Sequence, residues 1–246
     1  MLEARDLDKS FGALEVTRGV SLRLPPGARH AIVGPNGSGK TTLFNLLAGE
    51  LRPERGQVLL DGHDVTRLSP DARARLGLGR SFQKSDLFPD LSVRENLAVA
   101  LAIGKRRSAV FWRPFAGLPG LAEATVALAR RVKLEALLDQ PARTLAYGTQ
   151  RQLELGMALA GAPRVLLLDE PTAGMSAEET EAMTALIAAL PRDIALLIVE
   201  HDMEVVFEIA ERITVLDRGA VLIEGTPAEV RGSELVRRRY LGEHAR

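Results

Sequence analysis

The sequence predicts an α/β fold in which a parallel sheet carries a phosphate-binding loop, and three observations predict it. From residue 165 to residue 216, strand-like apolar runs alternate with helical segments, which is typical of a parallel sheet. Residues 165–168 are apolar throughout, as expected for a strand that is buried on both faces. A glycine-rich segment at residues 34–42 lies between a short strand and a helix, which is the usual setting of a phosphate loop.

The first part of the chain contains short strands that are separated by turns. Alternating or continuous apolar residues predict strands over residues 2–7, 20–24, 29–33 and 57–60. A helix over residues 42–48 follows the glycine-rich segment. Ser69 and Pro70 mark the start of a second, short helix, because they suit its N-cap and its first position.

A helix-rich segment over residues 84–161 then interrupts the alternation of strands and helices, and it is interpreted as an inserted α-helical subdomain. Helices are expected over residues 91–103, 121–138 and 150–160, the first of them with a capping box formed by Ser92 and Glu95. Residues 104–120 hold several basic residues and the only tryptophan, Trp112. They are interpreted as a surface insertion, with a partner- or lipid-facing loop as the alternative.

The final part returns to the α/β pattern. Strands are expected over residues 165–169, 194–199 and 212–216, and helices over residues 176–190 and 202–210. We therefore expect one domain over residues 1–246, in which residues 1–83 and 162–231 form the α/β core. Residues 232–246 form a C-terminal tail.

The composition excludes some kinds of site and favours no charged partner. The chain has 246 residues, of which 46% are hydrophobic, enough for a sizeable core. Lys and Arg number 32, as do Asp and Glu, so no overall positive charge favours nucleic acid. The absence of cysteine excludes disulfides and thiolate metal sites. No apolar run approaches the length of a membrane span, and no secretory signal is expected at the N-terminus.

The glycine-rich segment satisfies the pattern of a phosphate loop without a mismatch. Glycines let backbone N–H groups approach phosphate oxygens, and the helix that follows adds its positive dipole end. Lys40 is expected to reach the β- and γ-phosphates of a nucleoside triphosphate, and Thr41 to bind Mg²⁺. The expected nucleotide-binding residues here are Gly34, Pro35, Asn36, Gly37, Ser38, Gly39, Lys40, Thr41 and Thr42.

Polar side chains follow two of the buried strands, at the sheet edge where α/β folds bind ligands. Asp169 is the expected Mg²⁺ ligand and Glu170 the expected general base for an attacking water. His201 follows the strand over residues 194–199 and could bind the γ-phosphate and orient Glu170 and water. The histidines at positions 30, 63 and 244 are interpreted as structural.

Three further positions complete the predicted site. Gln83 has an amide oxygen that could bind Mg²⁺ or place the water, at the junction with the helical lobe. Phe11 could stack on an adenine ring, although a core aromatic is an equal alternative. The segment Ala146, Tyr147, Gly148, Thr149 and Gln150 precedes a predicted helix, whose start offers N–H groups to an anion.

Taken in this order, these elements resemble the ATP-binding subunit of an ABC transporter. The resemblance covers essentially the whole chain and implies a RecA-like P-loop NTPase core, an antiparallel β region and the inserted helical subdomain. Gln83 corresponds to the Q-loop, residues 145–150 to the signature, residues 166–170 to Walker B and His201 to the H-loop. The segments at residues 79–83, 147–148, 200–203 and 239–243 are similar to those of branched-chain amino acid importer ATPases. Urea importer and lipopolysaccharide-export ATPases share parts of this pattern.

The resemblance also implies cofactors, partners and a location. ATP and Mg²⁺ are expected, with the signature of a second ATPase subunit completing the γ-phosphate site in trans. A heterodimer of two ATPase subunits is expected, with a homodimer as the alternative. The dimer would bind two membrane permeases, and it would work with a solute-binding protein only indirectly. The subunit would be cytoplasmic, held on the inner face of the membrane by the permeases. A nucleic-acid- or ribosome-directed ABC ATPase and a regulatory module without hydrolysis are the rival functions, and no nucleic-acid partner is expected.

Two departures from the family pattern concern the contact in trans. The family signature is usually Leu-Ser-Gly-Gly-Gln, and here Ala146 replaces the serine and Thr149 the glutamine. A lost hydrogen bond to a charged phosphate costs about 1.5–3 kcal/mol, so weakened closure of the ATP-bound dimer is expected. Residues 173–176 occupy the D-loop position without the aspartate that the family often has.

Overall fold

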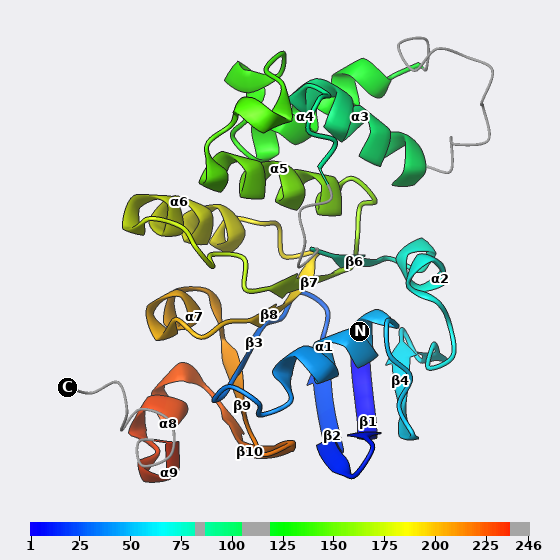
Figure 1. Ribbon diagram of the computed structural model, residues 1–246, viewed down its shortest axis with the longest axis vertical. Helices are drawn as coiled ribbons and strands as arrows, with labels where there is room; N and C mark the ends of the chain where they lie inside the picture. Colours follow the sequence, from blue (N-terminus) through cyan, green and yellow to red (C-terminus); the bar gives the residue numbers. More distant parts are fainter. Residues whose placement is uncertain (82–86, 105–118, 237–246) are drawn as a thin grey trace.

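Two β-sheets organise the part of the chain that the structure, a computed structural model, describes: residues 1–81, 87–104 and 119–236 (Figure 1). Gln83, Trp112 and the segment at residues 239–243 lie outside these described residues. One sheet has the strand order β2-β1-β4-β5 and is antiparallel; the other has the order β10-β9-β3-β8-β7-β6. In the second sheet all neighbours are parallel except β9 and β10. The predicted α/β fold, with its antiparallel region, is confirmed.

The elements follow each other along the chain much as the sequence predicts. The strands are β1 Leu2–Phe11, β2 Leu14–Leu24, β3 Arg29–Val33, β4 Arg55–Leu60, β5 His63–Asp64, β6 Leu78–Arg80, β7 Val165–Asp169, β8 Ala195–Val199, β9 Arg212–Asp217 and β10 Ala220–Gly225. The helices are α1 Lys40–Ala48, α2 Pro70–Arg75, α3 Val93–Gly104, α4 Leu121–Arg131, α5 Tyr147–Leu159, α6 Ala177–Ala188, α7 Met203–Ile209, α8 Pro227–Gly232 and α9 Glu234–Val236. Strands β5, β6 and β10 were not predicted: β5 and β6 are only two and three residues long, whereas β10 has an apolar run over residues 220–223 that was not interpreted as a strand.

The six-stranded sheet lies between two layers. Figure 1 shows α6 and α7 on one face and α1 with the antiparallel sheet on the other. Every residue of β3, β7 and β8 is buried, because both faces of these central strands are covered. Side chains that alternate along β7 pack into two different cores, Leu166 with the helical side and Leu167 with α1 and the antiparallel sheet.

Helices α3, α4 and α5 form a separate lobe next to the β6–β7 edge of the sheet (Figure 1). The capping box predicted for α3 is confirmed, since Ser92 and Glu95 exchange side-chain and backbone hydrogen bonds. Helix α4 ends at Arg131 rather than continuing to residue 138, because Lys133 adopts a left-handed backbone (φ +58°). No helix in the described ranges has the length and apolarity needed to cross a bilayer.

The register of the parallel strands brings the predicted site residues to one edge. Val199 of β8 pairs with Asp169 of β7 on one side and with Ile32 of β3 on the other. The segments that follow these three strands therefore begin side by side at the carboxyl edge of the sheet. They are the phosphate loop, the turn with Glu170 and the loop with His201.

His30 of β3 illustrates how the same sheet buries a titratable side chain without using it in the site. It is 1% exposed, and its Nε2 lies 2.8 Å from Thr214 Oγ1 on β9. Burial lowers the pKa of His30 to about 4; Glu224 opposes this shift and Arg212 adds to it. The structural interpretation of this histidine is consistent with its place in the core.

The low pKa of His30 predicts a loss of stability in mild acid. As pH falls from 6.5 to 4, the unfolded chain takes up the proton before the folded chain does. The difference removes about 3 kcal/mol of unfolding free energy. Denaturant unfolding at pH 7, 6, 5 and 4 should show this slope in the wild type and a shallower one in His30→Gln. A variant of the exposed His63, His63→Gln, should keep the wild-type slope, and equal slopes in all three proteins would contradict the assignment.

Candidate functional site

The phosphate loop connects the buried strand β3 to helix α1 and is held close to neighbouring backbone. Gly34 has a φ of +153° and Gly39 a φ of +102°. A Cβ at Gly34 would lie 2.2 Å from Leu216 O, and one at Gly39 2.5 Å from Val16 O. No other residue fits at these two positions without moving the backbone of β9 or β2. The loop is therefore shaped by the strands around it.

Two polar side chains of the loop are directed inward. Lys40 is buried, and its Nζ donates hydrogen bonds to the carbonyl oxygens of Gly34 (2.7 Å) and Pro35 (3.1 Å). Burial lowers the pKa of Lys40, while Glu170 and Asp169 raise it. The buried Ser38 Oγ has no hydrogen-bond partner among the described residues. A buried hydroxyl without a partner is costly, and a phosphate oxygen is a suitable acceptor for it.

Asp169, the last residue of β7, is a buried acidic group whose pKa is raised. It is 6% exposed, and its Oδ2 has no hydrogen-bond partner in the described part of the chain. Burial raises the pKa of Asp169 to about 6; Glu170 and Glu200 add to this, whereas Arg80 and Lys40 oppose it. A buried carboxylate oxygen without a donor is suited to a cation.

Glu170 and His201 follow neighbouring strands and are more open to solvent than Asp169. Glu170 is half-buried and has a left-handed backbone with a φ of +46°, which is a strained conformation for a residue with a side chain. Its N–H donates to Val199 O at 2.8 Å. The His201 side chain is 62% exposed, and its Nδ1 lies 3.8 Å from Glu200 Oε2. Thr41, at the start of α1, is also exposed.

The signature segment forms the first turn of α5 instead of preceding the helix, with Ala146 as an exposed N-cap that makes no side-chain cap. The N–H of Gly148 donates to Glu179 Oε1 of α6 at 3.0 Å. The hydroxyl of Tyr147 donates to Ala173 O at 3.1 Å. Within the described residues the segment thus bonds to the chain that follows β7, and no hydrogen bond joins it to the phosphate loop. Thr149 and Gln150 are half-buried on the same helix.

Phe11 lies at the end of β1, in the hairpin whose second strand touches the phosphate loop through Val16. Its side chain is exposed, and Lys9 Nζ lies 5.4 Å from the centre of its ring. Of the two interpretations open from the sequence, the core aromatic is therefore wrong. An exposed ring at this position is available for stacking.

Two functional candidates escaped the sequence interpretation. Glu200 is completely buried between the turn after β7 and the loop with His201, and Glu179 occupies the Gly148 N–H. An acidic residue directly after the apolar strand β8 was the available signal for Glu200. For Glu179 the only signal in the sequence was its place in a capping box with Ser176. Its hydrogen bond to Gly148 of α5 joins residues that are 31 positions apart.

The residues present fit a nucleotide with a divalent cation. The phosphate loop offers backbone N–H groups at the N-terminus of α1 to an anion, and it holds the buried polar side chains of Lys40 and Ser38. No group of three or more acidic, histidine or cysteine side chains forms a metal site among the described residues. Mg²⁺ is commonly held by one carboxylate with phosphate oxygens and water, and Asp169 with Thr41 is consistent with such a site.

Comparison with known proteins gives a consistent result. A model of the ABC transporter family matches residues 17–173. The chain is 37% identical to the high-affinity branched-chain amino acid transport ATP-binding protein BraF of Pseudomonas aeruginosa and 38% identical to LivG of Escherichia coli, a protein of the same description. Each alignment covers 99% of this chain and 98% of the relative. The ADP conformation of MJ1267, an ATP-binding cassette of an ABC transporter, superimposes with a TM-score of 0.86 at 26% identity, over 98% of both chains.

Proposed function

This chain belongs to the ABC transporter family and is an ATP-binding subunit with ATPase activity coupled to transport, and from that premise we propose that it powers the import of branched-chain amino acids. The observation that carries the proposal is the sequence identity of 37–38% to two branched-chain amino acid transport ATP-binding proteins over nearly the full length of all three chains. Cassettes of this family dimerise and work with permease subunits. A heterodimer with a second, similar cassette is part of the proposal.

The carboxyl edge of the six-stranded sheet provides the groups for hydrolysis. Residues 34–42 bind the triphosphate, with Lys40 neutralising charge on the β- and γ-phosphates, and Phe11 stacks on the adenine. Glu170 accepts a proton from water as the water oxygen attacks the γ-phosphorus and the bond to the β–γ bridging oxygen breaks. His201 orients this water and the γ-phosphate. Asp169 and Thr41 would hold Mg²⁺, which would supply charge stabilisation of the phosphoryl group.

The second half of the site comes from the partner cassette, through residues 146–150. In the single chain the Gly148 N–H donates a hydrogen bond to the Glu179 carboxylate. To bind a γ-phosphate, this N–H must leave the carboxylate and donate to a phosphate oxygen instead. Ala146 has no hydroxyl to offer in that exchange. Both features are consistent with an ATP-bound dimer that closes weakly.

Ala146→Ser is therefore expected to tighten ATP-driven dimerisation. A hydrogen bond to a charged phosphate contributes about 1.5–3 kcal/mol, which corresponds to roughly a tenfold or greater gain in dimer affinity. Sedimentation or light scattering of an ATP-trapped form would measure it. Because serine at an N-cap also stabilises a helix, the melting temperature without ATP serves as the control. Unchanged dimerisation and ATPase rate would contradict the assignment.

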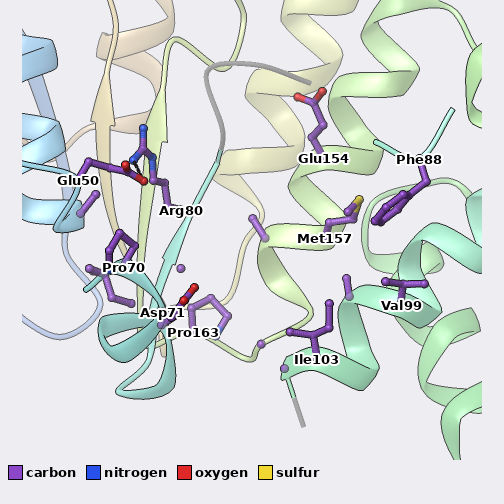
Figure 2. A pocket seen from close by; sticks show the side chains of 18 residues that line it. Glu50, Pro70, Asp71, Arg80, Phe88, Val99, Ile103, Glu154, Met157 and Pro163 are labelled. Carbon is purple, nitrogen blue, oxygen red and sulfur yellow. Dashed lines mark ion pairs between the residues drawn. The ribbon is translucent and has the colours of Figure 1, made fainter. Parts of the chain in front are cut away.

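A cavity of about 520 Å³ between the core and the helical lobe is the proposed contact for a permease (Figure 2). Phe88, Val99, Ile103 and Met157 face it from the lobe, opposite α2 and β6 of the core. Phe88 and Ile103 are exposed apolar side chains, and such side chains gathered at one place favour a protein contact. The permeases would hold this subunit at the inner face of the membrane.

Reconstitution tests the proposal as a whole. The chain would be combined with its candidate partner cassette and permeases in proteoliposomes, with leucine, ribose or urea offered through the matching solute-binding protein. ATP-dependent accumulation of leucine alone is expected. Uptake of ribose or urea instead would reject the amino-acid assignment, and ATPase activity stimulated only by nucleic acid or ribosomes would reject transport.

A further inference from the structure

We infer that Glu200 is a positioning residue that fixes the turn carrying Glu170 and the loop carrying His201 in one mutual geometry. The inference rests on the proposed hydrolytic function, since it assigns a role in the same reaction. It adds a residue that contacts neither ATP nor water in the proposed scheme.

Both carboxylate oxygens of Glu200 accept hydrogen bonds from the two segments concerned. Oε1 accepts from the N–H of Thr172 (3.1 Å) and from its hydroxyl (2.7 Å). Oε2 accepts from the N–H of His201 at 3.1 Å. Thr172 lies two residues after Glu170, so a single side chain connects the expected base to the expected γ-phosphate sensor.

The turn after β7 needs such a restraint because its backbone is strained. Glu170 has a left-handed backbone, with a φ of +46°, a conformation that persists only where the surroundings enforce it. The enforcing bonds are Glu170 N–H to Val199 O (2.8 Å), Ala173 N–H to Glu170 O (3.1 Å) and the pair between Thr172 and Glu200. Loss of the last pair removes the bonds that Glu200 makes to the turn and leaves the turn with its backbone bonds and the bond from the Tyr147 hydroxyl to Ala173 O.

The chemistry of a carboxylate, rather than of any polar group, matches the site. Glu200 is 0% exposed, and a buried carboxylate is tolerated when donors surround it. In the described part of the chain, the three groups that form hydrogen bonds with it are all donors. In Glu200→Gln, the amide oxygen can still bind Thr172, but the NH₂ group would face the N–H of His201. Two donors in contact repel each other, so the loop with His201 must move.

Within the described ranges, no hydrogen bond holds the His201 ring against such a movement. Its side chain is mainly exposed, and Nδ1 is 3.8 Å from Glu200 Oε2, beyond hydrogen-bond length. The position of the imidazole is therefore set through its backbone, which Glu200 holds.

The test compares four variants of the intact cassette: Glu200→Gln, Thr172→Val, Thr172→Ser and Thr184→Val. Thr184 is the matched control, because it is a buried threonine whose hydroxyl has no hydrogen-bond partner within the described residues. Steady-state ATPase kinetics would give kcat and KM, and a fluorescent ATP analogue would give the nucleotide Kd. We expect kcat to fall about tenfold or more in Glu200→Gln and Thr172→Val, with KM and Kd changed less than threefold. Thr172→Ser should recover most of the rate, and Thr184→Val should match the wild type.

A double-variant cycle separates positioning from a general structural effect. In a His201→Ala background, Glu200→Gln should cost at least threefold less in single-turnover rate than it does in the wild type, since part of its effect passes through His201. Fully multiplicative losses, an unchanged kcat in Thr172→Val, or an equal loss in Thr184→Val would each overturn the inference. If Glu200→Gln does not fold, the comparison of kcat between Thr172→Val and Thr172→Ser decides. Failure of the proposed function has a different signature, in which Glu170→Gln hydrolyses ATP at the wild-type rate.

Discussion

Glu170→Gln is expected to lower the ATPase rate by at least about 100-fold while leaving ATP binding intact, since general-base catalysis typically contributes two to four orders of magnitude. Gln has nearly the same shape but cannot accept the proton of the attacking water. Among the described residues, the turn around Glu170 is held by backbone bonds and by Glu200, and no hydrogen bond from the Glu170 carboxylate contributes. The substitution should therefore remove the proton acceptor and spare the fold.

The same variant should accumulate the ATP-bound dimer, because closure precedes hydrolysis in the proposed cycle. Phosphate release and the sedimentation of the ATP-bound species would measure the two effects in one preparation. Glu178→Gln is the matched control: Glu178 is an exposed glutamate in the first turn of α6, and its rate should equal that of the wild type. A Glu170→Gln enzyme with the wild-type rate would remove the basis for assigning Glu170 as the base.

Local signals in the sequence were sufficient for the four inner strands of the six-stranded sheet, β9, β3, β8 and β7, and for the segments that follow β3 and β7. The strand at residues 29–33 and the phosphate loop after it were predictable, since an apolar run, glycines and a helix start lie next to each other in the chain. The same holds for β7 with Asp169 and Glu170. In each case the physical cause is contained within a few neighbouring residues.

Contacts between distant segments were beyond such reasoning. The sequence predicts that α5 starts at residue 150, whereas the helix begins at Tyr147. Glu179 of α6 holds the N-terminal turn of α5 by accepting a hydrogen bond from the Gly148 N–H. Likewise, Glu200 could be seen in the sequence only as a neighbour of His201. Its bonds to Thr172 depend on the register of β7 against β8, which sequence periodicity does not specify.

Arg73 is the clearest case of a long-range contact with a large predicted effect on stability. It is fully buried on α2. Its Nη1 donates to the carbonyl oxygens of Leu46 (2.8 Å) and Leu47 (2.6 Å) in the last turn of α1, and its Nη2 donates to Thr66 O (3.0 Å). Burial lowers the pKa of Arg73 to about 10, so the side chain remains charged at neutral pH. A cation at this place complements the helix dipole and the free carbonyl groups of the helix end.

Arg73→Met should therefore reduce the unfolding free energy by about 3–5 kcal/mol, because it leaves several buried carbonyl groups without a donor. Arg73→Lys keeps the charge but not the planar fork of donors, and about half of that loss is expected. Arg75→Met, at an exposed position of the same helix, should lie within about 0.5 kcal/mol of the wild type. Denaturant unfolding would rank the three variants. Since α1 begins at Lys40, bound nucleotide should stabilise Arg73→Met through the other end of the same helix. If Arg73→Met unfolds like the wild type, Arg73 does not anchor the end of α1.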